Sequence, residues 1–274
     1  MASRFWVGGP GTWDSSTTTN WSATSGGAGG QSVPGSSDDV TFDGSSGGGT
    51  VTVNNASLSI LSLTMSAFTG TLDFATNNNN VTIGGNFVNT GAGTRTLNMG
   101  NGTWTLSSTA AAFNQNGATN LTFNANSSTI SFTATTGTAQ RRMLLGNRTY
   151  STVSFASGAA AVNIVGPGTI GTLTISPGNL VVLSNGITVT VTTMTNITGS
   201  TSAQTLFITD NSLFGQATIS SANNWTGTWC SFGYMAFTGG GTFSATSSAD
   251  LKNNSGITIT APSAGGGVIG VIGG

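Results

Sequence analysis

The stretch TLDFATNNNNVTIGGNFVNTGAGTRTLNMGNGTWTL, residues 71–106, contains four short segments in which apolar and polar residues alternate. Side chains two positions apart on a strand lie on the same face, so each segment predicts a short β-strand with one buried face. The Asn- and Gly-rich stretches between the segments tolerate the left-handed backbone of tight turns. The apolar pairs that define the four strands are Leu72/Phe74, Val81/Ile83, Leu97/Met99 and Trp104/Leu106.

Equivalent strand positions return at a regular interval along the chain. Strands follow one another about every nine residues, and corresponding apolar residues recur after roughly 24 to 26, as coils of three strands require. The pattern predicts an all-β fold, a parallel β-helix or β-solenoid with coils of about 25 residues. The alternative is a β-sandwich, which has a similar strand spacing, although two-residue Asn-Gly hairpin turns are scarce here. The two repeating series are Leu72, Leu97, Leu121 and Val81, Leu106, Ile130.

Composition divides the chain into three regions around this stretch. Residues 49–220 continue the alternation and are interpreted as the solenoid. Residues 1–48 are rich in Trp, Gly and Asp and are predicted to cap the solenoid or to attach it to a larger particle. Residues 221–274 form a C-terminal β region, and we expect its apolar, glycine-rich tail, Ala264 to Gly274, to pack into a neighbouring subunit.

The chain lacks most of the side chains that enzymes use. It has no His, no Glu, one Lys and one Cys among 274 residues, and charged residues make up 5%. The usual nucleophilic triads need His, and Cys230 has no base near it in sequence, so we interpret it as a buried thiol. A net charge of −1 without a basic stripe argues against nucleic-acid binding. We therefore expect a non-catalytic protein with no cofactor and no nucleic-acid partner.

The sequence also lacks signals for export and membrane insertion. No cationic segment followed by an apolar run opens the chain, and no stretch approaches the roughly 18 apolar residues of a membrane span. One Cys cannot form an internal disulfide, which fits folding in a cytoplasm. Virion proteins fold in the cytoplasm and still have the composition of surface-exposed proteins, because they leave the host by lysis.

The Asp residues offer few arrangements for catalysis or metal binding. Glycoside hydrolysis needs two carboxylates facing one sugar, but the adjacent Asp38 and Asp39 would point to opposite faces of a strand, and Asp73 has no identifiable partner. Asp38, Asp39 and Asp43 in VPGSSDDVTFD are weak candidates for calcium ligands, since carboxylate oxygens suit that ion. Their spacing matches neither an EF-hand nor a calcium-binding nonapeptide repeat. Turn stabilisation is the preferred interpretation, and no metal site is predicted.

Five of the six Trp residues lie toward the two ends of the chain. The open ends of a solenoid are edges that need apolar cover, so we predict that these residues cap the solenoid or contact a subunit. Sugar-stacking platforms are the alternative. The residues are Trp6, Trp13, Trp21, Trp225 and Trp229.

The polar and basic positions suggest three further interpretations. Thr, Ser and Asn take the outward places of Lys and Glu, which avoids repulsion between equivalent side chains stacked about 4.8 Å apart. TVTV, TIGTLTI and ITVTVTT resemble the flat Thr-x-Thr faces of ice-binding solenoids, but their irregular spacing argues against that function. The three basic residues Arg141, Arg142 and Arg148, near Gly146–Asn147, are interpreted as a solvated or subunit-contacting loop.

The opening RFWVGGPGTWDSSTTTNWSATSGGAGGQSVPGSSDDVTFD, residues 4–43, resembles the N-terminal signature of β-helical structural proteins of tailed bacteriophages. NRTYSTVSFASG and GTIGTLTISPGNLVVL resemble the coils that follow in such proteins. The resemblance implies a virion component, assembled in the host cytoplasm. We expect a capsid decoration or head-fibre protein, a homotrimer in contact with other virion proteins. The alternatives are a tail fibre or spike that binds host surface polysaccharide and, disfavoured by the missing export signal, a bacterial adhesin.

Overall fold

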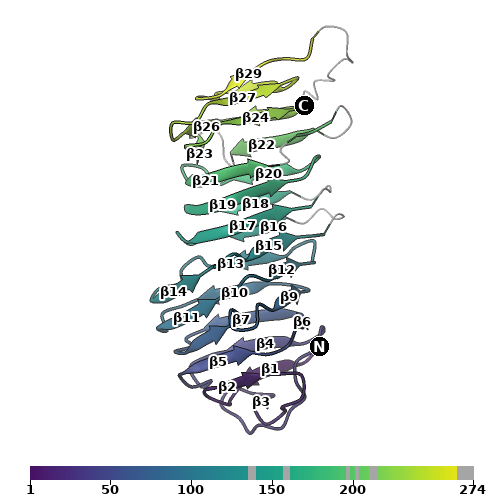
Figure 1. The fold of residues 1–274 in the computed structure, drawn as a ribbon, viewed down its shortest axis with the longest axis vertical. Helices are drawn as coiled ribbons and strands as arrows, with labels where there is room; N and C mark the ends of the chain where they lie inside the picture. The colour runs from purple at the N-terminus through teal and green to yellow at the C-terminus, as the bar shows by residue number, and fades with distance from the viewer. Residues whose placement is uncertain (135–139, 157–160, 196–197, 201–203, 210–214, 264–274) are drawn as a thin grey trace.

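A computed structural model describes residues 1–134, 140–156, 161–195, 198–200, 204–209 and 215–263. The protein is an elongated rod of stacked strands, with the N-terminus at one end and the last strands at the other (Figure 1). The stacked parallel strands form a β-solenoid of about 8 turns with coils of ~23 residues, so the predicted fold is confirmed and the sandwich alternative is excluded. The tail Ala264 to Gly274 and Asp210 lie outside the described residues. Among the described residues, no helix is long and apolar enough to cross a membrane.

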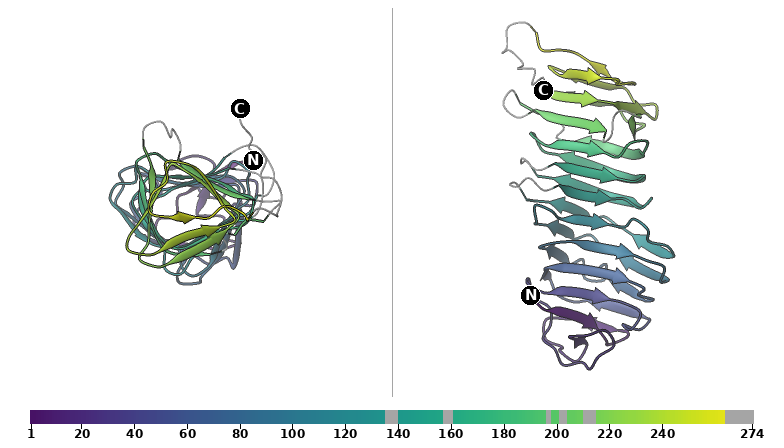
Figure 2. Two further views of the ribbon diagram at one scale, coloured as in Figure 1. Left: turned by 90° about the horizontal axis from the view of Figure 1, so that it is seen from above. Right: turned by 180° about the vertical axis from the view of Figure 1, so that it is seen from behind.

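The described strands form four sheets, and the two views of Figure 2 show the coils from above and from behind. The 12-stranded sheet contains, in spatial order, β3 (Trp21–Ser22), β1 (Ser3–Trp6), β4 (Asp39–Phe42), β7 (Ser62–Ser66), β10 (Phe87–Thr90), β13 (Ala112–Asn114), β16 (Arg141–Leu144), β18 (Val162–Val165), β20 (Leu180–Leu183), β22 (Thr205–Thr209), β25 (Cys230–Gly233) and β28 (Ala249–Lys252). The 5-stranded sheet contains β2 (Gly11–Trp13), β5 (Thr50–Val53), β8 (Thr71–Asp73), β11 (Arg95–Asn98) and β14 (Leu121–Asn124).

The remaining strands complete the other two faces of the coils. The 9-stranded sheet contains β6 (Ser57–Ile60), β9 (Asn80–Ile83), β12 (Thr103–Leu106), β15 (Thr129–Phe132), β17 (Thr149–Phe155), β19 (Gly168–Ile175), β21 (Thr188–Thr195), β23 (Ala217–Ser220) and β26 (Met235–Thr238). The 3-stranded sheet contains β24 (Trp225–Thr228), β27 (Phe243–Thr246) and β29 (Thr258–Ile259). The parallel ladders continue across positions 48/49 and 220/221, because β2 pairs with β5 and β23 pairs with β26.

One continuous hydrophobic core runs through the rod, from Trp6 to Ala245. The register places equivalent apolar residues directly above one another, and several are aromatic. Phe87 stacks on Phe113 with ring centroids 4.4 Å apart, and Phe132 stacks on Phe155 at 4.9 Å. Offset stacking adds about 0.5–1.5 kcal/mol per pair to the burial of apolar area. Inward stacking of the repeated residues therefore holds successive coils together.

The outer face of the 9-stranded sheet carries an aligned column of hydroxyl side chains. The irregular spacing of these residues in the sequence disappears in the structure, because loops of different length restore the register between strands. Thr174 and Thr195 are hydrogen-bonded through their hydroxyls at 2.8 Å. The column consists of Thr82, Thr105, Ser131, Ser154, Thr174 and Thr195.

Asparagine side chains link successive coils at the turns and along the 5-stranded sheet. Asn124 Nδ2 donates to Asn98 Oδ1 at 2.7 Å, and Asn98 Nδ2 donates to Asp73 Oδ1 at 3.3 Å. At the next corner, the backbone N–H of Asn101 donates to Asn78 Oδ1 at 2.9 Å. The asparagine amides therefore satisfy polar groups between coils without the repulsion of like charges.

Two arginines lie inside the solenoid, which corrects part of the sequence interpretation. Arg141 is fully buried and donates to the Ala134 carbonyl and to Asn179 Oδ1, whereas its neighbour Arg142 is exposed. Alternation along β16 explains the difference, since adjacent side chains point to opposite faces. Arg95 is also buried and donates to Asn89 Oδ1 and to nearby carbonyls. Burial lowers the pKa of both guanidinium groups.

The coils change shape part-way along the rod. From β4 to β15, each coil has three short strands, one in each of three sheets; we call these the three-strand coils. From β16 to β21, each coil has two strands, one of them long; we call these the two-strand coils. Side-chain partners in adjacent coils are 25 and 26 residues apart in the first region, at Asp73–Asn98 and Asn98–Asn124, but 21 apart at Thr174–Thr195 in the second. A candidate site lies where the two regions meet.

Candidate functional site

Among the described residues, the 5-stranded sheet ends at β14, and no strand of the coil above pairs with it. Phe123 lies in the same inward column as Leu72 and Leu97, both of which are fully buried. With no paired strand on its upper side, Phe123 is only partly buried. The arginine at the next corner covers part of the open edge, since Arg148 donates to the carbonyls of Leu121 and Ala118 at 3.1 and 2.9 Å.

The long strands of the two-strand coils turn a corner above this edge. In β17, Tyr150, Val153 and Phe155 are all buried, and the change from a three-residue to a two-residue interval shows that the strand bends between Tyr150 and Val153. The paired residues of β17 and β19 skip one position at this bend, at Ser151 and Gly171. A Cβ atom on Gly171 would lie 2.6 Å from the Ser151 carbonyl oxygen, so the close approach of the two bends requires glycine.

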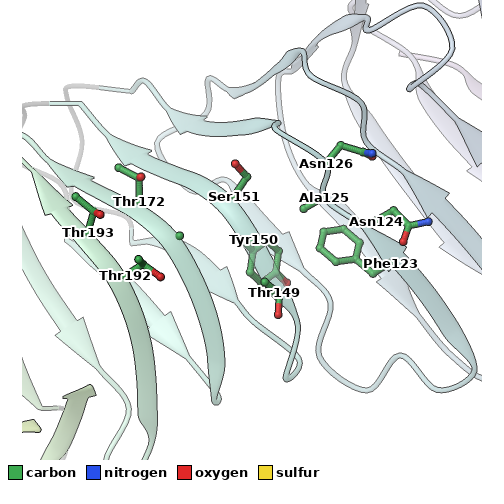
Figure 3. Close-up of a pocket in the computed structure, with 11 residues that line it drawn as sticks. Phe123, Asn124, Ala125, Asn126, Thr149, Tyr150, Ser151, Thr172, Thr192 and Thr193 are labelled. Atoms are coloured by element: carbon green, nitrogen blue, oxygen red, sulfur yellow. The ribbon is translucent and has the colours of Figure 1, made fainter. Parts of the chain in front are cut away.

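The end of β14 and the bends above it enclose an open groove of about 660 Å³, which we call the step groove. Figure 3 shows Phe123 beside Tyr150, with Asn124 and Asn126 on one side and the threonines of β19 and β21 on the other. The Phe123 and Tyr150 ring centroids are 5.1 Å apart. The groove is lined by Phe123, Asn124, Ala125, Asn126, Thr149, Tyr150, Ser151, Gly171, Thr172, Thr192 and Thr193.

The step groove is electrically neutral and rich in hydrogen-bonding groups. None of the eleven described residues that line it carries a charge. Tyr150 is buried and donates its hydroxyl to the Leu145 carbonyl at 2.7 Å, and burial raises its pKa above the ordinary value. Within the described part of the chain, the hydroxyls of Thr149, Ser151 and Thr172 form no hydrogen bond, which leaves them free for a ligand or water.

The N-terminal tryptophans gather at one end of the rod. Trp6, Trp13 and Trp21 are all fully buried. The ring centroid of Trp21 lies 5.1 Å from that of Trp6 and 5.0 Å from that of Trp13. Trp21 belongs to β3, which pairs antiparallel with β1 and is the outermost strand of its sheet. These rings are therefore part of the core and present no exposed platform.

The C-terminal residues occupy two different environments. Trp225 is buried and stacks on Phe237 with an interplanar angle of 4°, whereas Trp229 is half-buried between β24 and β25. Cys230 is fully buried, and burial raises the pKa of its thiol to about 11. A thiol with this pKa is protonated at neutral pH and is a poor nucleophile.

The three candidate metal ligands engage in separate hydrogen bonds. Asp38 accepts from the backbone N–H groups of Ala2 and Gly35, each at 3.1 Å. Asp39 accepts from the Ser62 hydroxyl one coil above, and Asp43 accepts from the N–H of Ser45 at 2.8 Å. Among the described residues, no group of three or more acidic, Cys or His side chains is placed to hold a metal ion. Asp73 accepts from Thr76 and from Asn98 and faces no second carboxylate in those bonds.

Sequence reasoning did not identify the step groove. Phe123 follows Leu121 by two residues, as on an ordinary buried strand, and its inward direction in the structure agrees with that pattern. The exposure of its ring depends on the coil above. The shorter interval between Tyr150, Ile170 and Val191, which pair in the structure, is the sequence signal of the change in coil shape.

Comparisons with known proteins provide no relative for this chain. No family model matches it, and no curated protein or solved structure shows significant similarity to it.

Proposed function

We propose that this chain is a non-catalytic structural protein of a bacteriophage virion, a rigid rod displayed on the particle surface as a capsid decoration or head fibre. The observation that carries the proposal is the uninterrupted core from Trp6 to Ala245, enclosed by neutral polar columns. Such a rod has few sites for trypsin-like proteases and no repelling charge ladders. The resemblance of residues 4–43 to phage β-helical proteins adds the particle context.

The two ends of the rod would have different tasks. Trp6, Trp13 and Trp21, together with β3, would cap the first coil and so prevent edge-to-edge aggregation. At the other end, Leu251 of β28 is 53% exposed in a chain whose large apolar residues are mostly buried. We propose that this end contacts other copies of the chain in a homotrimer or another virion protein. The half-buried Trp229 belongs to it, because Trp229 directly precedes β25, the strand that pairs with β28.

Cryo-electron microscopy of the intact particle that contains the chain tests this proposal. Rod-shaped density at many symmetry-related sites on the shell is the expected result. Density confined to the tail would overturn the decoration role and support the second candidate, a tail fibre or spike that binds a host glycan. The step groove is the observation that favours this second candidate. Native mass spectrometry of the purified chain tests the trimer separately.

A further inference from the structure

We infer that the step groove is a binding site for a neutral oligosaccharide. The inference goes beyond the structural role, and it rests on the second candidate function only for the biological source of the glycan. It combines three observations on the described part of the chain: a partly exposed aromatic ring, a set of unused hydroxyl groups and the absence of charge among the residues that line the groove.

The aromatic ring provides an apolar surface in an otherwise polar groove. Phe123 points inward like the buried leucines below it, but its side chain is only partly buried. Tyr150 packs against Phe123 with ring centroids 5.1 Å apart. Its own position is fixed by the hydrogen bond that its hydroxyl donates to the Leu145 carbonyl. A pre-formed aromatic surface of this kind suits the C–H face of a sugar ring, which is apolar and of similar width.

The polar groups are arranged around this ring. Thr149 and Ser151 come from β17, Thr172 from β19, and Thr192 and Thr193 from β21, so hydroxyls from three successive coils face one groove (Figure 3). Each hydroxyl both donates and accepts, as sugar hydroxyls do. Asn124 and Asn126 add amide groups: Asn124 uses its Nδ2 for Asn98, and Asn126 uses its Oδ1 for the N–H of Gly100, which leaves the second polar atom of each amide available.

Size and charge favour a glycan over other ligands. The volume of about 660 Å³ falls within the range of roughly 300–1,000 Å³ typical of ligand sites and accommodates more than one sugar ring. A phosphate or carboxylate ligand would find no cation among the described residues that line the groove. A peptide strand would need a continuous free edge on β14, but Arg148 already occupies the carbonyl of Leu121.

Binding of neutral oligosaccharides to the purified full chain tests the inference. The probes are maltoheptaose, cellohexaose, chitohexaose and mannan and galactan fragments on an array, with uronic-acid and sialic-acid oligosaccharides as the acidic set. Isothermal titration calorimetry then measures the strongest ligand. We expect a neutral ligand to bind, and Phe123→Ala to weaken its binding about tenfold or more through loss of the aromatic surface.

A second pair of variants separates loss of the site from loss of the fold. Thr172→Arg fills the groove and is expected to abolish binding, whereas Thr82→Arg places the same side chain on the exposed face of β9 and is expected to leave binding unchanged. Both variants should retain the circular dichroism spectrum of the wild type. The inference is overturned if no neutral probe binds, if only acidic probes bind, or if binding survives both Phe123→Ala and Thr172→Arg. None of these results bears on where the chain sits on a particle, which microscopy decides.

Discussion

The three-strand and two-strand coils share one core and one hydroxyl column, but they differ in shape, and the step groove lies at their junction. In the three-strand coils, β14 and the strands below it form a separate face. In the two-strand coils, a single bent strand turns the corner, and the repeat falls to 21 residues at Thr174–Thr195. Each coil is covered only by its neighbours, so a change in coil shape leaves the last strand of the larger coils without a partner. Irregularity between repeats, and not any single motif, creates the candidate site.

Removing the largest side chain of the three-strand core is the strongest way to test how the two regions depend on each other. Trp104 is fully buried, and its ring centroid lies 4.6 Å from that of Phe74 and 5.6 Å from that of Phe87. Trp104→Ala is expected to lower the free energy of unfolding by about 3–5 kcal/mol, because it leaves a cavity between coils. Urea denaturation followed by circular dichroism measures the change.

The exposed neighbour of Trp104 provides the control. Thr103→Ala should change the free energy of unfolding by less than about 0.5 kcal/mol. If Trp104→Ala cost under about 1 kcal/mol, the core of the three-strand coils would not be the continuous support described here. Hydrogen exchange shows whether β16 to β21 stay protected when the lower coils open.

The fold was predictable from sequence because the solenoid depends on a local and repeated pattern. Leu72, Leu97 and Leu121 recur at the coil length, and the structure stacks the first two in one column, beneath Phe123. The step groove was not predictable in the same way. Whether Phe123 is covered depends on β17, which is more than twenty residues further along the chain, and the sequence of β14 itself carries no sign of it. Likewise, the aligned hydroxyl column appears only when loop lengths are known.

The bend that ends the three-strand pattern is tested by one glycine. Gly171→Ala would bring a Cβ atom to 2.6 Å from the Ser151 carbonyl oxygen, which forces the two bends apart. We expect a loss of about 1–3 kcal/mol in the free energy of unfolding, as for other overpacked sites. Gly35→Ala is the matched control, since its nearest neighbour, Asp38 Oδ2, is 4.0 Å away. Equal melting temperatures for the two variants would show that the bend has room to relax.

The hydroxyl column crosses the junction of the two regions, and like charges placed along it are expected to lower the free energy of unfolding. Thr105→Lys, Ser131→Lys and Ser154→Lys together place three like charges on adjacent strands about 4.8 Å apart. The triple variant should lose about 1–2 kcal/mol relative to the sum of its single variants, and ~1 M salt should restore most of this loss. Replacing the middle lysine with Ser131→Asp alternates the charges and should remove the penalty. A salt-independent loss would point to steric causes instead.

The smallest expected effect concerns the first coil, on which the three-strand coils stack. Asp14 accepts hydrogen bonds from the backbone N–H groups of Thr17 and Ser16, and these bonds lower its pKa to about 2. Because the pKa is lower in the folded protein, the bonds contribute stability above about pH 4, and the contribution disappears as the pH falls toward 2. Asp14 is partly exposed to solvent, so the change in melting temperature between these pH values should be small. Asp14→Asn does not titrate, so its melting temperature should depend less on pH. In the wild type at low pH, hydrogen exchange should show a loss of protection in β2 and β5, while β17 to β21 stay protected. An equal loss of protection along the whole rod would mean that the first coil and the two-strand coils unfold as one unit, and that the two regions differ in shape but not in stability.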